Sequence, residues 1–308
     1  MSLSIYTRRM RIREIVWSVT FAIIASSCGS ADQSKARTAG DEPAATVQKS
    51  SMTAPPPPVE MAEVSGGMFI YGATEDQFQI YLAQSRVGFP GMQELLHKAL
   101  VIPPQSLSLS DFWMDEFEVT NRQFAEFLAN TGYQPTSAVG FLQNWEAAQY
   151  PEWAADFPVV WVSVEDAQAY CHWRGARLPT DQEWEKAFRG PSGRLFPWGN
   201  KLPDPDTTNA GSGKVEPVGN RPGDCSQYGI YDLAGNVSEL IGSQVDYDGG
   251  RSYVIRGGSF RDGVQSLLGF HRHLGVSEND RSESVGFRCV SDRQPQTVEN
   301  RPAAAGTH

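Results

Sequence analysis

Four cysteines carry the most versatile side-chain chemistry in this chain: Cys28, Cys171, Cys225 and Cys289. Thiolates are soft ligands that suit Cu(I), and thiols form disulfides in oxidising compartments. A copper site of this kind needs two cysteines close together, whereas a single cysteine can carry a lipid. The residues around each cysteine therefore indicate which of these roles it has.

The first cysteine ends a segment that has the features of an export signal. Four arginines come before a short apolar stretch, Ile15–Ala25, which falls well short of the roughly 20 residues that span a membrane. A basic start, a short apolar region and small residues are typical of a signal peptide. The small residues before Cys28 resemble a bacterial lipobox, which predicts residues 1–28 as a lipoprotein signal peptide with an acylated Cys28. The alternative is an ordinary signal peptide cut nearby, with an incidental Cys28.

The segment after Cys28 has the composition of a tether. Residues 29–58 are rich in small and polar residues and end in four prolines. Such a segment cannot bury a core, and polyproline is stiff and extended. We expect a disordered tether at 29–58, a folded domain at 59–293 and a disordered tail at 294–308. The lipid would hold the domain at a bacterial membrane, on its periplasmic or surface face.

Capping boxes predict three helices within the domain, because each box satisfies the free amides of a first helical turn. The boxes are Thr120–Gln123, Ser163–Asp166 and Thr180–Glu183, each followed by apolar residues on one face and by a glycine that ends the helix. Short strands are expected at Met68–Tyr71, Phe112–Val119, Tyr253–Ile255 and Val285–Val290. With 29 glycines and 20 prolines, the remainder indicates irregular backbone. The expected fold class is α+β, loop-rich with little regular secondary structure.

Two histidines late in the domain raise the question of a metal site. His271 and His273 stand two residues apart, with Asp262 and Glu283 in range. This spacing occurs in metal sites, but the chain has five histidines and no further ligand pattern, which favours two solvated or hydrogen-bonded side chains. No Gly-x-Ser-x-Gly elbow indicates a serine nucleophile. The net charge of −10 argues against nucleic-acid binding, which needs a basic face.

An ordered series of short motifs gives the domain a specific resemblance. The motifs are Ser65–Phe69, Glu118–Asn121, Ala169–Trp173, Arg177–Glu185, Phe196–Asn200, Tyr228–Val237, Arg256–Phe260 and Gly286–Cys289. In this order they resemble the sulfatase-modifying-factor domain of the formylglycine-generating enzyme family, over nearly the whole domain. The resemblance implies a compact fold related to C-type lectins.

The resemblance also exposes a departure from the family's chemistry. The family's oxidase binds copper through two cysteines, at the third and eighth positions after the serine of a Gly-Gly-Ser motif. Those positions here are Asp262 and Leu267, and residues 261–275 contain no cysteine. The family's Trp-Glu-Trp is also altered, to Ser238-Glu239-Leu240. Because neither position supplies a thiolate, the sequence argues against copper and against formylglycine formation.

A structural calcium ion is the cofactor that the resemblance does imply. The ligands would be the side chains of Asp232 and Glu239 and the backbone carbonyls of Gly235 and Val237. These are hard oxygen donors, which suit Ca²⁺. The alternative is a simple Asx-type turn held by Gly235 and the asparagine after it.

The resemblance further implies a disulfide between Cys171 and Cys289, which leaves Cys225 as a free or buried thiol. Together these features predict an exported lipoprotein with a non-catalytic binding or assembly role at the cell envelope. Its partners would be the membrane, through the lipid, and an envelope protein or a small ligand, with no nucleic acid.

The alternative is an enzyme of the same family that uses a different cofactor or site. The surroundings of Ser259, Asp262 and Arg272 distinguish the two hypotheses. Polar groups that converge on a deep cleft there would favour catalysis or small-ligand capture, and a filled surface would favour protein contacts.

Overall fold

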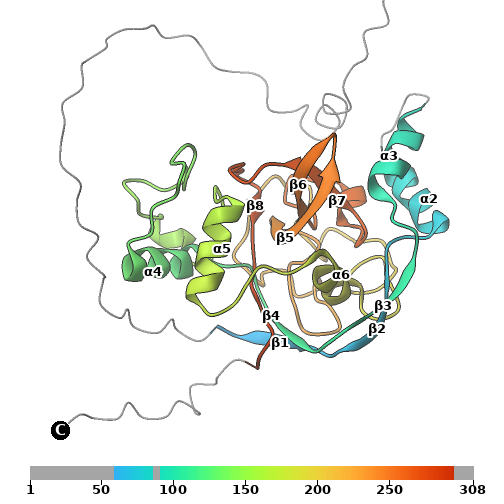
Figure 1. Ribbon diagram of the computed structural model, residues 1–308, viewed down its shortest axis with the longest axis horizontal. Helices are drawn as coiled ribbons and strands as arrows, with labels where there is room; N and C mark the ends of the chain where they lie inside the picture. The colour runs from blue at the N-terminus through green and yellow to red at the C-terminus, as the bar shows by residue number, and fades with distance from the viewer. Residues whose placement is uncertain (1–58, 86–90, 295–308) are drawn as a thin grey trace, which may run out of the picture. The chain divides into compact units, whose positions relative to one another are not determined.

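Short helices and short strands alternate along the chain in the computed structural model, which describes residues 59–85 and 91–294 (Figure 1). The helices are α2 (Glu75–Gln84), α3 (Met92–Leu100), α4 (Asn121–Thr131), α5 (Val164–Trp173) and α6 (Asp181–Arg189), with the 3-10 turns η1 (Glu152–Ala154) and η2 (Val264–Leu267). The strands are β1 (Met61–Val64), β2 (Gly67–Tyr71), β3 (Gln105–Leu109), β4 (Phe112–Asp115), β5 (Ser238–Tyr247), β6 (Gly250–Arg256), β7 (Arg272–Val276), β8 (Val285–Gly286) and β9 (Val290–Ser291). This is the predicted loop-rich α+β class. The predicted signal peptide with Cys28, the tether, and the tail beyond Gln294 lie outside the described residues.

The strands form three small sheets, in the orders β1-β4-β9, β2-β3 and β7-β6-β5-β8. Neighbouring strands are antiparallel except for the short pairing of β5 with β8. In the largest sheet, Arg256 of β6 lies opposite Glu239 of β5 on one side and Arg272 of β7 on the other. The register therefore brings three charged residues from distant parts of the sequence to one place.

The three predicted helices are confirmed. α4, α5 and α6 begin at Thr120, Ser163 and Thr180, and each has a complete capping box. α4 and α6 end at the predicted glycines, and α5 ends one residue before its glycine. Each cap contributes about 1 kcal/mol of stability because it satisfies an amide that the helix leaves free. The helices are thus specified locally.

The apolar core lies between α4, α5 and the last strands. Phe124, Tyr170 and Phe287 are fully buried there and pack ring against ring. The disulfide between Cys171 and Cys289 belongs to this core, with its Cα atoms 5.7 Å apart. The predicted pairing is therefore confirmed, and it joins α5 to the segment between β8 and β9.

Two predicted strands are shorter than expected. β4 ends at Asp115, and the predicted strand Val285–Val290 divides into β8 and β9, which belong to different sheets. The cause is Arg288, whose buried guanidinium donates to the carbonyls of Asp115 and Glu116 and so draws both segments around it. A buried charge thus replaces regular ladder hydrogen bonds.

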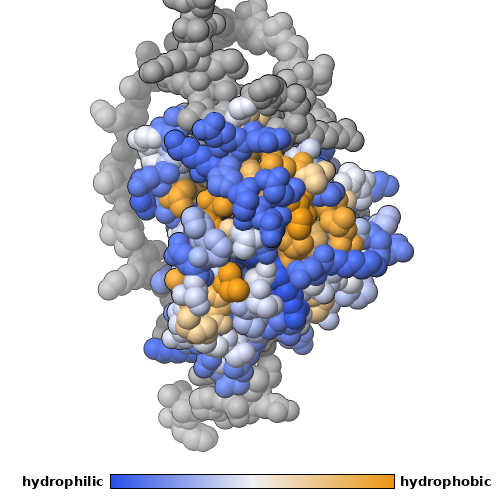
Figure 2. Space-filling view, turned by 90° about the vertical axis from the view of Figure 1, so that its right-hand side faces the viewer, coloured by the Kyte–Doolittle hydropathy of each residue, from blue (hydrophilic) through white to orange (hydrophobic). Residues whose placement is uncertain are grey.

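Two helices were not predicted from the sequence. α2 and α3 lie together at one side of the domain, beside the large sheet (Figure 1). α2 carries a capping box of Thr74 and Gln77, a signal of the same kind as the three that were used. The face on this side exposes hydrophobic groups interspersed with hydrophilic ones (Figure 2). Within the described residues, none of the helices is long and apolar enough to span a bilayer.

Candidate functional site

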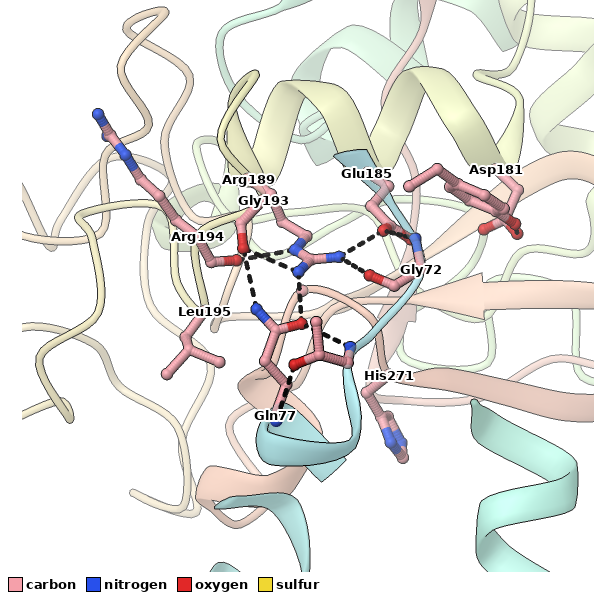
Figure 3. Close-up of polar contacts among 12 residues, drawn as sticks. Gly72, Gln77, Asp181, Glu185, Arg189, Gly193, Arg194, Leu195 and His271 are labelled. Carbon is pink, nitrogen blue, oxygen red and sulfur yellow. Dashed lines mark hydrogen bonds and ion pairs between the residues drawn. The ribbon is translucent and has the colours of Figure 1, made fainter. Parts of the chain in front are cut away.

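A first group of buried charges is built on α6. Asp181, Glu185 and Arg189 stand four residues apart, which places them along one face of the helix. Glu185 accepts from Arg189 (2.6 Å) and from the amide of Gly72 (2.7 Å). Arg189 also donates to the carbonyls of the loop after α6 and to Gln77 of α2 (Figure 3). All donors of this fully buried guanidinium therefore have acceptors.

A second arginine closes this group from the large sheet. Arg256 of β6 lies 3.1 Å from Asp181 and 2.6 Å from Glu185. Tyr71 donates to Asp181 (2.5 Å), and burial, the first cause, raises the pKa of that phenol, with Asp181 adding to the shift. We call Asp181, Glu185, Arg189 and Arg256 the α6 cluster. Its two buried carboxylates face two buried guanidiniums, and Arg272 adds a third guanidinium 3.7 Å from Asp181, so each carboxylate has cationic partners within the chain.

Among the described residues, no hydrogen bond or ion pair joins Arg272 to Ser259 or Asp262, the other two predicted pocket residues. Asp262 accepts the amide (2.9 Å) and the hydroxyl (2.5 Å) of Ser259, which makes a closed local turn. Arg272 is buried and lies 3.7 Å from Asp181 of the α6 cluster. The side chains that were expected to line one pocket are therefore committed to two different contacts.

The family's second copper position is filled by an apolar side chain. Leu267 is 1% exposed, and a Cβ atom added to Gly258 would lie 2.4 Å from its Cδ2. Nearby, Tyr81 of α2 stacks on His271 with ring centroids 5.6 Å apart. Neither Asp262 nor Leu267 can supply a thiolate, so these residues do not fit a Cu(I) ion.

The two histidines differ from the expectation of solvated or hydrogen-bonded side chains. His271 is 7% exposed, and its ring lies 4.6 Å from that of His273. Each has a buried nitrogen to which residues 59–85 and 91–294 offer no hydrogen-bond partner. Burial lowers the pKa of His271, and His273 and nearby arginines lower it further, so the ring is neutral. Among the described residues, no three His, Cys, Asp or Glu side chains come together in a way that could hold a metal ion.

A second group of buried charges surrounds the predicted calcium ligands, and it is not balanced. Its four carboxylates and one guanidinium are each at most 3% exposed: Glu118, Asp224, Asp232, Glu239 and Arg288. Glu239 accepts from Trp184 (2.8 Å) and from Arg288 (2.7 Å). We call these five residues the acidic cluster.

Glu118 is the least satisfied member of the acidic cluster. It lies 4.0 Å from Arg288, and neither of its oxygens has an N–H or O–H donor in the part of the chain that the structure describes. Burial raises the pKa of Glu118 well above its usual range, and the charge of Asp232 adds to this. Burial likewise raises the pKa of Asp232 to about 6 and that of Asp224 to about 8. Each carboxylate is thus destabilised in its charged form.

The proposed calcium ligands are two carboxylates, of Asp232 and Glu239, and two backbone carbonyls, which are hard oxygen donors; no third carboxylate of the described residues joins them at one metal-binding point. In the described ranges, no backbone amide donates to the carbonyl of Gly235 or of Val237. Asp232 and Asn236 adopt left-handed backbone conformations with φ of 59° and 56°. A Cβ atom on Gly235 would meet the Thr208 hydroxyl at 2.0 Å, so only glycine allows the chain to pass here. Two free carbonyls beside excess carboxylates form the oxygen-rich surroundings that Ca²⁺ prefers.

The remaining cysteine does not complete another site. Cys225 is a free, half-buried thiol whose sulfur lies 3.4 Å from the carbonyl of Ser226. Burial raises the pKa of this thiol, which keeps it in the weakly nucleophilic protonated form. It therefore offers no low-pKa thiolate for catalysis.

Together, the irregular α+β fold and the order of the motifs along the chain define a formylglycine-generating-enzyme type of domain. Residues 46–293 match the model of the FGE-sulfatase family, described as a sulfatase-modifying factor enzyme 1-like domain. The chain belongs to this family.

Curated relatives include proteins named as active and as inactive. The chain is 33% identical over 243 residues to the inactive C-alpha-formylglycine-generating enzyme 2 of Bos taurus, covering 61% of this chain and 80% of that protein. It is 30% identical over 260 residues to the formylglycine-generating enzyme of Thermomonospora curvata, covering 62% of this chain and 85% of that one.

Solved structures share the fold. PvdO from Pseudomonas aeruginosa matches with a TM-score of 0.55 at 21% identity, over 75% of this chain and 93% of that one. CarF matches with a TM-score of 0.52 at 21% identity, over 78% of this chain and 99% of that one. The predicted family and fold class are therefore confirmed.

Three residues of the acidic cluster were missed by sequence reasoning: Glu118, Asp224 and Arg288. Glu118 stands between Phe117 and Val119, and an acidic residue flanked by apolar ones is a usable signal of a buried charge. Asp224 lies among polar loop residues and gives no such signal. Its place in the cluster depends on the chain returning to donate the amide of Ala234 to it.

Proposed function

We propose that this chain is a lipid-anchored, non-catalytic member of the formylglycine-generating enzyme family that binds an envelope protein or a small ligand at the cell envelope. The observation that carries the proposal is the state of the two copper positions. Asp262 is closed into a turn with Ser259, and Leu267 is buried against Gly258. A site that offers no thiolate at either position lacks the soft ligands that the family's copper chemistry needs.

Two further observations support a binding role. The segment that would hold the reaction cleft is covered by α2, through the stacking of Tyr81 on His271. Relatives from Bos taurus and Mus musculus at 33% and 32% identity carry the name of an inactive enzyme. Non-catalytic use of this fold thus has a precedent among proteins that this chain resembles.

Calcium is proposed as a structural ion of this domain. Asp232 and Glu239, with the carbonyls of Gly235 and Val237, would hold it. When bound, the ion would supply the positive charge that four buried carboxylates lack beside one guanidinium. Its role would be to hold the loop before β5 against the segments that contribute Glu118 and Asp224.

Anchoring is proposed through a lipid on Cys28, which would place the domain at a bacterial membrane. The test is labelling of cells with a palmitate analogue, in which wild type should be labelled and Cys28→Ala should not. The substituted protein should also pass to the soluble fraction, because acyl chains supply the membrane affinity. Equal labelling of the two proteins would contradict the anchor.

The non-catalytic role is tested by measuring whether the protein binds Cu(I) under reducing, oxygen-free conditions. A competing chromogenic chelator should retain all copper in the presence of this protein. The formylglycine-generating enzyme of Thermomonospora curvata, at equal concentration, serves as the positive control. One-to-one withdrawal of copper by this protein, lost in Cys225→Ser, would overturn the proposal.

A further inference from the structure

The loop between α4 and α5 contains a strained turn. Glu146 and Gln149 exchange both of their backbone hydrogen bonds, each 2.9 Å long, around Ala147 and Ala148. The two alanines have φ of 49° and 62°. Two-residue turns of this type prefer Asn-Gly, because side chains with a Cβ atom are disfavoured in the left-handed region.

Strain of this kind is concentrated in one stretch of the chain. Seven non-glycine residues with positive φ occur in the described ranges, and four of them lie between Leu142 and Trp161. Residues held in disfavoured conformations cluster at ligand sites, where the surroundings over-determine them. The loop is therefore a place to look for a binding site.

A cavity of about 290 Å³ opens beside this turn. Ala125 of α4 contributes to it, and its other lining residues belong to the loop between α4 and α5. Its lining residues are Ala125, Trp145, Ala148, Gln149, Tyr150 and Glu152. The strained turn thus contributes two of the residues that form the cavity wall.

Two aromatic walls meet in the cavity. The rings of Trp145 and Tyr150 have centroids 5.4 Å apart and stand at 68° to one another. The Trp145 indole donates to Asn121 of α4 (3.0 Å), which fixes the orientation of its ring. The Trp145 ring is therefore held in place before any ligand arrives, with Tyr150 packed edge to face against it, and such pre-organisation favours binding.

The charge of the cavity selects the ligand. Glu152 is exposed and is the ionisable group in the lining apart from the Tyr150 phenol, and no Lys, Arg or His lines the cavity. Aromatic faces attract cations through their quadrupole, and a carboxylate adds a formal opposite charge. An anion would meet Glu152 without compensation.

We infer that this cavity binds a small organic ammonium cation, of which a trimethylammonium head group is the type. The volume is at the lower end of the range for ligand pockets, which suits a head group better than a drug-sized molecule. Gln149 adds an amide for a hydroxyl or carbonyl beside the cation. This site is separate from the Ser259 and Leu267 region, so it does not rest on the proposed function.

The experiment is calorimetric titration of the full chain with choline and with its neutral isostere, in which a tert-butyl group replaces trimethylammonium. Choline should bind, and the isostere should bind roughly tenfold more weakly or worse. Glu152→Gln and Tyr150→Leu should each weaken choline binding about fivefold or more. Glu126→Gln removes an exposed carboxylate of α4 outside the cavity and should have no effect.

Melting curves check that each variant is folded. Because Glu152 is exposed, the Glu152→Gln variant should fold like the wild type. Equal binding of choline and the isostere would overturn the inference. So would an equal loss in Glu126→Gln and Glu152→Gln, or the absence of saturable choline binding by folded wild type. Competition with phosphatidylcholine vesicles and with a trimethyl-lysine peptide would separate a lipid or peptide source from a free solute.

Discussion

Two groups of buried charges lie in this domain, and they differ in how their charges are compensated. In the α6 cluster, two carboxylates face two guanidiniums, with Glu185 bonded to both Arg189 and Arg256 at 2.6 Å. In the acidic cluster, four carboxylates share Arg288, and Glu118 has no donor among the described residues. The first group is complete within the chain, whereas the second requires a cation or protons from outside.

This difference indicates that the α6 cluster stabilises the fold, whereas the acidic cluster has the features of a cation-binding site. A buried charge without a partner costs several kcal/mol, so a fold keeps one only if something compensates it. The α6 cluster ties α6, β2 and β6 together and leaves nothing to bind. The acidic cluster has free carbonyls at Gly235 and Val237 beside its excess charge.

The largest expected effect comes from breaking the α6 cluster. Arg256→Met should lower the free energy of unfolding by about 3–5 kcal/mol, because it removes the buried guanidinium that contacts both Asp181 (3.1 Å) and Glu185 (2.6 Å) and so weakens the compensation of both carboxylates. Arg122→Met is the matched control, since Arg122 and Asp156 are paired on the surface, and it should cost less than about 1 kcal/mol. Urea denaturation measures both. Equal effects would contradict the role given to the α6 cluster.

Removal of calcium should have the next largest effect. Excess chelator should lower the melting temperature, because a ligand present at a hundredfold its Kd stabilises the native state by about 2.7 kcal/mol. Asp232→Ala should abolish that sensitivity, while Asp246→Ala, on the exposed part of β5, should retain it. An identical melting curve with and without chelator would remove the acidic cluster from consideration as a calcium site.

The free energy of unfolding of the calcium-free protein should depend on pH, because the acidic cluster has more carboxylates than cationic groups. Burial raises the pKa of Asp224 to about 8 from an ordinary value of 3.8, and the charge of Asp232 adds to this shift, while Arg288 opposes it. The folded state then binds more protons than the unfolded state between these values, so stability should fall as the pH rises. From pH 5 to pH 7 the loss should be on the order of 2 kcal/mol, seen by denaturation in chelator.

Bound calcium should suppress this loss, because the ion takes over the compensation that protons provide at low pH. The control is therefore the same titration with calcium in excess. A calcium-free protein that gains stability between pH 5 and pH 7 would show that the acidic cluster is already compensated within the chain.

The smallest expected change in stability comes from Glu118→Gln, and the same substitution at Glu185 should change stability in the opposite direction. Glu118→Gln removes an unpartnered charge and should stabilise the chelated protein by about 1 kcal/mol at pH 8. The same change at Glu185 breaks contacts with two arginines and should destabilise it by about 3–5 kcal/mol. The two clusters thus predict opposite signs for one type of substitution. A loss of stability in both variants would erase the distinction between them.

Local signals in the sequence predicted the parts of the fold that are specified locally. The capping residues Thr120, Ser163 and Thr180 identified three helices, since each cap is formed within one turn of chain. The disulfide between Cys171 and Cys289 came from the family resemblance and is present. The same type of signal at Thr74 was passed over, so α2 could also have been predicted.

Long-range charge contacts explain what sequence reasoning could not predict. Arg288 bends the chain at Asp115 and divides a predicted strand, and nothing within a few residues of Val285 indicates this. The contacts of Arg272 with Asp181 and of Asp262 with Ser259 likewise depend on tertiary arrangement. A list of ionisable residues therefore suggested a pocket where the fold makes separate contacts.

The most direct test of the account is incubation of the copper-treated, calcium-loaded protein with a sulfatase-motif peptide under oxygen, followed by mass spectrometry. The formylglycine-generating enzyme of Thermomonospora curvata, run in parallel, establishes that the conditions support turnover. Because Asp262 and Leu267 provide no thiolate, the account predicts that the peptide cysteine remains unchanged. Conversion of the peptide cysteine to formylglycine, abolished by Cys225→Ser, would contradict it.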